Sequence, residues 1–177
     1  MTTTASPGSR AGGGVIAIVD VQYAETRARV GCVLARDWLD AAPAAEHTLE
    51  TEVAAAYVPG EFYRRELPPV LEVLRGVADL ATVIIDAHVW LGPDRPGLGA
   101  RLHDALGGAV AVVGVAKNAF SGAPSLPVIR NAARPLYVSA IGLDPREAAA
   151  QVAAMHGPYR IPALIRRADQ LARGRSL

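Results

Sequence analysis

The sequence predicts an α/β fold in which helices flank a mixed β-sheet. Two patterns indicate this: three strand-like runs follow one another near the start, and helical segments then alternate with short apolar runs. The chain has 177 residues, of which 51% are hydrophobic and 20% charged, so it is large enough to bury a core. We expect residues 15–177 to form a single domain after a disordered lead rich in Thr, Ser and Gly, residues 1–14.

The first part of the predicted sheet consists of strands at 15–21, 28–35 and about 46–56. The link between the first two is short and polar, which favours antiparallel neighbours. A helix is predicted over 67–80, because apolar residues recur there at the spacing of one helical face. Pro68 and Pro69 fit the first turn of this helix, where no amide donor is lost.

The second part of the chain alternates strands with helices. In chain order we expect a strand at 83–86, a helix at 98–106, strands at 109–113 and 136–139, and helices at 144–155 and 162–173. The strands are short, apolar and β-branched, as buried strands are. Asp144 is a helix N-cap residue, followed by Pro145 at the first helical position and Glu147 at the third.

The composition excludes several classes of protein. No apolar run reaches the roughly 18–20 residues that span a bilayer, and the polar lead lacks the apolar core of a signal peptide. Cys32 is the single cysteine, so no internal disulfide can form. We therefore expect a soluble, cytoplasmic protein.

Three acidic residues lie at the edges of apolar segments. Asp20 interrupts the first strand, Asp86 ends the strand at 83–86, and Glu66 opens the helical stretch that follows the turn at 57–60. A buried carboxylate costs several kcal/mol unless a partner neutralises it. A divalent metal ion would satisfy all three, which makes them candidate metal ligands.

The basic residues are seventeen arginines and one lysine, Lys117, so this position is a candidate for a compact ammonium group. Five of the arginines crowd the last 18 residues: Arg160, Arg166, Arg167, Arg173 and Arg175. These residues either contact phosphates or form a solvated helix face. The net charge of +1 neither requires nor excludes a nucleic-acid partner.

Six segments of the chain, taken in order and spacing, resemble the endonuclease V family. They are VIAIVDVQY at 15–23, YVPGEFYRRELP at 57–68, IIDAHVWLGPDRPG at 84–97, VGVAK at 113–117, PLYVS at 135–139 and YRIPALIRRAD at 159–169. The resemblance extends from about Val15 to Ala172. Its most specific part is the nine-residue step from Tyr57 to Glu66, followed by I-I-D-x-H and V-G-V-A-K.

The resemblance implies an RNase H-like fold and metal-dependent nicking of DNA, or in some members RNA, near inosine, as a DNA repair activity. Asp20, Glu66 and Asp86 match the metal-binding carboxylates of the family, with Mg²⁺ as the expected ion and Mn²⁺ as the alternative. Lys117 matches a lysine expected to stabilise charge on the cleaved phosphate or to orient the attacking water. We accordingly name Asp20, Glu66, Asp86 and Lys117 as catalytic residues.

Nucleic-acid-binding roles follow from the same resemblance. Tyr57, Pro59 and Gly60 match the turn that inserts into the duplex as a wedge, and such a wedge lowers the cost of unstacking a base. Gly60 and Gly114 match glycines of the pocket for hypoxanthine. His88 keeps the position of a family histidine; it either contacts metal-bound water or phosphate, or is a rim residue without a direct role.

The chain also departs from the family pattern. Ala87 and Val89 replace two glycines that flank the histidine, and each adds a Cβ that we expect to intrude on the base pocket. A histidine expected six residues after Asp86 is Gly92, and the stretch 118–134 is shortened. The Gly-His pair that normally follows the sixth strand is replaced by Ile141-Gly142. These departures predict relaxed base specificity around an intact metal centre.

Two functions from different classes remain open at this point. The first is a Mg²⁺-dependent endonuclease, and the second is a catalytically weak relative that binds modified or structured nucleic acid. A more remote alternative is an RNase H-like nuclease with another structured substrate. The expected partner in each case is DNA or RNA, and the family resemblance predicts a monomer without an obligate protein partner.

Overall fold

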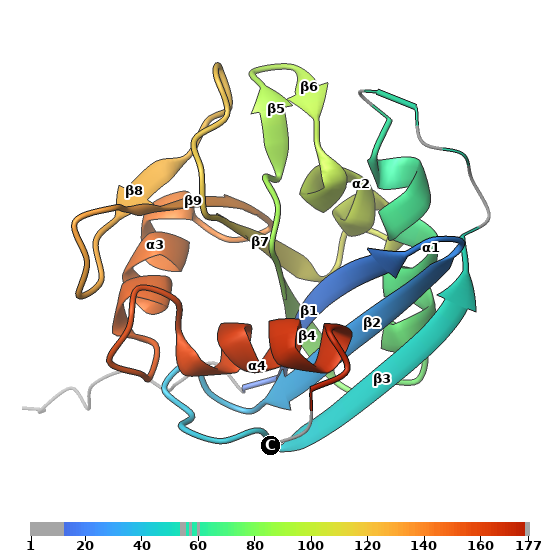
Figure 1. Cartoon of the computed structure of the whole chain (residues 1–177). Helices are drawn as coiled ribbons and strands as arrows, with labels where there is room; N and C mark the ends of the chain where they lie inside the picture. The colour runs from blue at the N-terminus through green and yellow to red at the C-terminus, as the bar shows by residue number, and fades with distance from the viewer. Residues whose placement is uncertain (1–12, 54–55, 57, 60, 176–177) are drawn as a thin grey trace, which may run out of the picture.

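The predicted mixed sheet is confirmed. The computed structural model describes residues 13–53, 56, 58–59 and 61–175, and in it seven strands form one sheet in the order β3-β2-β1-β4-β7-β9-β8 (Figure 1). These strands are β1 (Val15–Ala24), β2 (Arg27–Ala35), β3 (Ala45–Glu52), β4 (Leu80–Ile85), β7 (Ala111–Ala116), β8 (Leu126–Val128) and β9 (Leu136–Ile141). A small separate hairpin is formed by β5 (Trp90–Gly92) and β6 (Arg95–Pro96). The expected disordered lead lies, up to residue 12, outside the described residues.

The centre of the sheet is parallel and its flanks are antiparallel. β1 pairs in parallel with β4, and β4 in parallel with β7. β2 lies antiparallel to β1, as the short link between them predicted, and β9 lies antiparallel to β7. The carboxyl ends of β1, β4 and β7 therefore meet at one edge of the sheet.

Helices cover both faces of the sheet (Figure 1). They are α1 (Tyr63–Leu74), α2 (Leu98–Ala105), α3 (Pro145–Ala154) and α4 (Ala163–Ala172). Alternation along β1 divides the core: Ile16 and Ile18 pack with residues of α3 and α4, whereas Ala17 and Val19 pack with residues of α1 and α2. No helix of the described segments is long and apolar enough to cross a bilayer.

The predicted helix at 67–80 was misplaced by about one turn. α1 begins at Tyr63 and ends at Leu74, where Arg75 turns extended and Gly76 adopts a φ of 87°. Pro68 and Pro69 consequently lie inside the helix, not in its first turn. Packing of the apolar face against the sheet outweighs the lost amide bonds. The earlier start leaves Glu66 in the first turn of α1, in agreement with its expected position at the opening of the helix.

Other boundaries differ by a few residues. The third strand ends at Glu52 instead of Ala56, and the strand expected at 109–113 lies at 111–116. β5, β6 and β8 were not predicted, because runs of two or three residues carry no measurable periodicity. Asp144 caps α3 as expected, since its Oδ1 accepts hydrogen bonds from the amides of Arg146 and Glu147.

Candidate active site

Asp20 and Asp86 lie on adjacent strands, as the sequence predicted. Val19 pairs with Ile85 in the parallel register of β1 and β4, so the two aspartates that follow come side by side. Asp20 is held locally by a 2.9 Å hydrogen bond from the amide of Val21 to its Oδ1. The strand interior thus gives both carboxylates a defined position at one edge of the sheet.

Glu66 approaches the same region from α1. Burial, followed by the charges of Asp20 and Asp86, raises the pKa of Glu66 to about 8. Burial, followed by the charge of Asp86, raises the pKa of Asp20 to about 6. Glu66 therefore feels the charges of both aspartates and Asp20 feels that of Asp86, so the site disfavours their joint ionisation unless positive charge is supplied.

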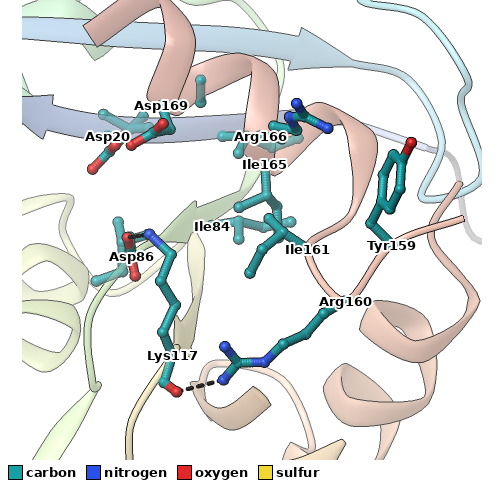
Figure 2. Close-up of a pocket in the computed structure, with 14 residues that line it drawn as sticks. Asp20, Ile84, Asp86, Lys117, Tyr159, Arg160, Ile161, Ile165, Arg166 and Asp169 are labelled. Carbon is teal, nitrogen blue, oxygen red and sulfur yellow. Dashed lines mark hydrogen bonds and ion pairs between the residues drawn. The ribbon is translucent and has the colours of Figure 1, made fainter. Parts of the chain in front are cut away.

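A fourth acid, Asp169 on α4, was missed by the sequence analysis. Its side chain points toward Asp20 (Figure 2), and a hydrogen bond and charge from Asp169 help to raise the pKa of Asp20. The available signal was its position at the end of the segment 159–169, which resembles the family. From the sequence alone, an acid on an amphipathic helix could equally well face solvent. Only the packing of α4 across β1 shows that Asp169 faces Asp20.

Two cations balance two of these acids. Lys117 follows β7, and its Nζ lies 2.6 Å from Oδ2 of Asp86. Burial lowers the pKa of Lys117, but the hydrogen bond to Asp86 and the surrounding acids outweigh this and raise it, which keeps the side chain protonated. Arg173 donates through Nε to both carboxylate oxygens of Asp169 at 2.9 Å.

The donor set suits a hard divalent cation. Carboxylate oxygens are the ligands that Mg²⁺ takes in small number while it keeps several waters. Among the residues that the structure describes, no three acidic, histidine or cysteine side chains stand close enough to coordinate one ion together. Two of the acids pair with Lys117 and Arg173.

The acids open into a cavity of about 280 Å³, here called the acid cavity (Figure 2). Asp20, Asp86, Lys117 and Asp169 line one end of it. Its remaining walls are Ile18, Val19, Ile84, Ile85, Tyr159, Arg160, Ile161, Ile165, Arg166 and Ala168. Glu66 does not line this cavity and acts on it through charge alone.

Glu66 lines a second cavity of about 390 Å³, here called the histidine cavity. Ala87, His88, Phe62 and Phe120 are among its other lining residues. Nε2 of His88 lies 3.1 Å from the carbonyl of Asn118, and its ring centroid lies 6.1 Å from that of Phe120. The buried Nδ1 of His88 has no hydrogen-bond partner in the described part of the chain. The histidine cavity thus combines the aromatic faces of Phe62 and Phe120 with polar side chains that include Glu66 and His88.

Val89 does not intrude on this cavity, contrary to the expectation from the sequence. Its side chain is fully buried and packs against α2, where a Cβ added to Gly99 would lie 2.7 Å from its Cγ2. The amide of Val89 donates to Oγ of Ser139 at 3.0 Å, which fixes this orientation. Of the two replaced glycines, only Ala87 lines the histidine cavity.

The remaining nucleic-acid-binding candidates have different surroundings. Gly114 is buried in β7, where the carbonyl of Ala87 passes so closely that a Cβ would collide with it. The glycine is therefore required by backbone packing, and it does not line the histidine cavity. Pro59 is exposed. Tyr57 and Gly60 lie outside the described residues, so the wedge stays a prediction.

Sequence comparisons show that this chain is similar to endonuclease V proteins. The family model described as endonuclease V matches residues 4–128. An endonuclease V from Streptomyces avermitilis is 34% identical over 194 residues, covering 94% of this chain and 82% of that protein.

Solved structures agree with the sequence comparisons. A crystal structure of the endonuclease V from Streptomyces avermitilis has a TM-score of 0.74 at 32% identity, covering 95% of this chain and 83% of that one. The fold also matches that of Ciona intestinalis endonuclease V in complex with a DNA containing an inosine followed by a ribo-adenosine. That match has a TM-score of 0.72 at 17% identity and covers 92% of this chain and 85% of that one.

Proposed function

This chain belongs to the endonuclease V family, and from that premise we propose that it is a Mg²⁺-dependent endonuclease that cuts phosphodiester bonds near inosine in DNA or RNA. Its RNase H-like fold is confirmed by the structural neighbours. The observation that carries the proposal is the gathering of Asp20, Asp86, Asp169 and Lys117 around one cavity, with Glu66 coupled to them by charge.

We assign Asp20, Asp86 and Asp169 as the residues that would hold the ion, with Glu66 contributing from α1. When bound, a divalent ion lowers the pKa of a water and stabilises charge on a leaving oxygen. The raised pKa values of Asp20 and Glu66 support this assignment, because a cation is the partner that the crowded carboxylates lack.

We assign Lys117 the role of contacting the phosphate that is cut. A protonated amine at the edge of the acid cavity can contact a non-bridging oxygen, where charge increases during cleavage. The ion pair with Asp86 keeps it charged and directed into the cavity until a phosphate competes for it. Glu66, with a pKa near 8, can hold a proton at neutral pH and release it when positive charge enters the site.

The histidine cavity is the proposed site for the flipped base. It adjoins the acids through Glu66 and through the consecutive residues Asp86 and Ala87. Phe62 and Phe120 provide faces for stacking, and His88 adds a polar ring to the lining. The Ciona relative was crystallised with inosine-containing DNA, which supports a base of this kind as the ligand.

The alternative, a catalytically weak binder, is favoured by one observation: the methyl group of Ala87 lines the cavity where the family pattern has glycine.

A nicking assay distinguishes the nuclease from the catalytically weak binder. Single- and double-stranded oligonucleotides of DNA and of RNA, containing inosine or adenine, are incubated with Mg²⁺ or with EDTA. Mg²⁺-dependent cleavage near inosine supports the nuclease, whereas binding without cleavage in every arm supports the alternative. A cytoplasmic location stays a prediction from the composition, and a monomeric state stays a prediction from the family.

A further inference from the structure

The acid cavity is larger than its carboxylates require. The acids and Lys117 occupy one end of its approximately 280 Å³, which is close to the lower size of small-ligand pockets. The other end has apolar walls formed by Ile84, Ile161 and Ile165 (Figure 2). These walls offer nothing to a metal ion, so this half of the cavity has no role in the site described above.

Arg160 supplies unused hydrogen-bond donors in the wall of this half. Its Nη2 donates to the carbonyls of Lys117 at 2.5 Å and Pro135 at 2.8 Å, which anchors the guanidinium. Both bonds come from Nη2, the buried Nε is out of reach of a ligand, and Nη1 makes no hydrogen bond among the described residues. Figure 2 shows the other terminal nitrogen turned away from the Lys117 carbonyl, toward the space beside Ile161. An oxygen or ring nitrogen of a ligand would satisfy such donors.

Tyr159 and Arg166 close the far end of the cavity (Figure 2). The Tyr159 side chain is 61% exposed, an unusual degree for an aromatic ring next to apolar walls. Cζ of Arg166 lies 5.5 Å from its ring centroid, within cation–π range, which favours a fixed ring orientation. Exposed aromatic rings of this kind serve as platforms on which unpaired bases stack.

Consecutive residues of one short stretch of chain line the two cavities. Asp86 lines the acid cavity, and the next two residues, Ala87 and His88, line the histidine cavity. A strand that places one base in the histidine cavity and a phosphate at the acids brings its next nucleotide within reach of the acid cavity. We propose that the apolar half of the acid cavity binds the base of the nucleotide on the far side of the cut phosphate from the inosine.

This inference rests on the proposed function and specifies the substrate as a strand unpaired on both sides of the cut. Tyr159 stacks on the base, the isoleucines contact its faces, and Arg160 donates to its edge. The anchoring of Arg160 on the Lys117 carbonyl links occupancy of this subsite to the residue that faces the phosphate.

The test uses inosine-containing oligonucleotides in which a single abasic residue replaces each nucleotide after the inosine in turn. The KM for cleavage by the native chain is expected to rise about 5- to 100-fold at one position only, the first nucleotide beyond the cut, as loss of one stacked base predicts. Tyr159→Ala should raise the KM for the intact substrate by a similar factor. On the substrate that is abasic at that position, Tyr159→Ala should raise the KM by less than about twofold over the native chain, because the stacking contact is already missing.

Leu39→Ala is the matched control, since Leu39 is a 60% exposed apolar side chain remote from both cavities, and it should leave every KM unchanged. Equal effects of Tyr159→Ala on all the abasic substrates would overturn the inference, as would a lack of any position-specific rise.

The proposed subsite can be tested separately from the nuclease activity. Binding of inosine-free single-stranded oligonucleotides is measured by fluorescence anisotropy in EDTA, where no cleavage occurs. A loss of affinity in Tyr159→Ala and in Arg160→Lys, with Leu39→Ala unchanged, supports the subsite even if no inosine substrate is cut. Unchanged affinity in both variants overturns it even if the chain is an active nuclease.

Discussion

Lys117 and Asp86 form an ion pair between the ends of two neighbouring parallel strands, with Nζ 2.6 Å from Oδ2. Both side chains remain partly exposed, at 40% and 26%, so the pair contributes less than about 1 kcal/mol to stability. The role that we propose for the ammonium group depends instead on its position in the acid cavity, which Asp20 and Asp169 also line.

We expect Lys117→Ala to lower the single-turnover cleavage rate by about 10²–10³-fold, the cost of removing one charge-stabilising donor. The free energy of unfolding should change by less than about 1 kcal/mol. Arg75→Ala breaks a comparable exposed pair with Glu72 and should leave the rate unchanged. A Lys117→Ala enzyme that cuts at the native rate would exclude contact of this residue with the phosphate.

The raised pKa of Glu66 predicts that the stability of the metal-free protein depends on pH. Because burial and its acidic neighbours raise its pKa from 4.5 to about 8, the folded state binds the proton more tightly than the unfolded chain. The free energy of unfolding should therefore fall as the pH rises from about 4.5 to about 8. Urea unfolding in EDTA at pH 5 and pH 8 measures this loss.

Glu66→Gln should remove most of the slope and increase stability at pH 8 by about 1–3 kcal/mol, since one pKa unit corresponds to about 1.4 kcal/mol. Glu72→Gln is the control, because Glu72 is on the same helix but exposed and paired with Arg75. If native protein and Glu66→Gln lose stability in parallel over this range, Glu66 is not the group that titrates.

Asp20 and Asp169, which interact by a side-chain hydrogen bond, should both affect metal-dependent cleavage. Asp20→Asn is expected to abolish cleavage, with little loss of stability or a gain, because it relieves repulsion from Asp86. Asp169→Asn should raise the Mg²⁺ concentration for half-maximal rate by tenfold or more, about the effect of losing one ligand contact. Asp104→Asn on the exposed side of α2 should alter neither quantity. An Asp169→Asn enzyme with native Mg²⁺ dependence would remove Asp169 from the site.

Base specificity should respond to Ala87 and not to Val89. Ala87 lines the histidine cavity, so we expect a native preference for inosine over adenine of only about 10–200-fold, typical of recognition by shape. Ala87→Gly should increase that preference. Val89→Ala should leave the ratio unchanged and destabilise the fold by about 1–3 kcal/mol, because it empties the space against Gly99.

Matched inosine and adenine oligonucleotides give the ratio, and urea unfolding gives the stability. A native preference of many thousandfold that Ala87→Gly does not increase would contradict the role given to Ala87.

The sequence by itself determined the α/β class, the order of the main strands and helices, and three acids of the site. Asp20 and Asp86 could be found locally, because a charge within a β-branched apolar run is costly without a partner.

The tertiary structure alone decided the rest. Asp169 became part of the site only when α4 packed across β1, since its helix position permits solvent contact equally well. Val89 turned into the core because Gly99 leaves room there and Ser139 holds its amide, and these are contacts between segments far apart in the chain. Local sequence specifies which residue types are present and their period, whereas the direction of each side chain depends on which distant segment packs against it.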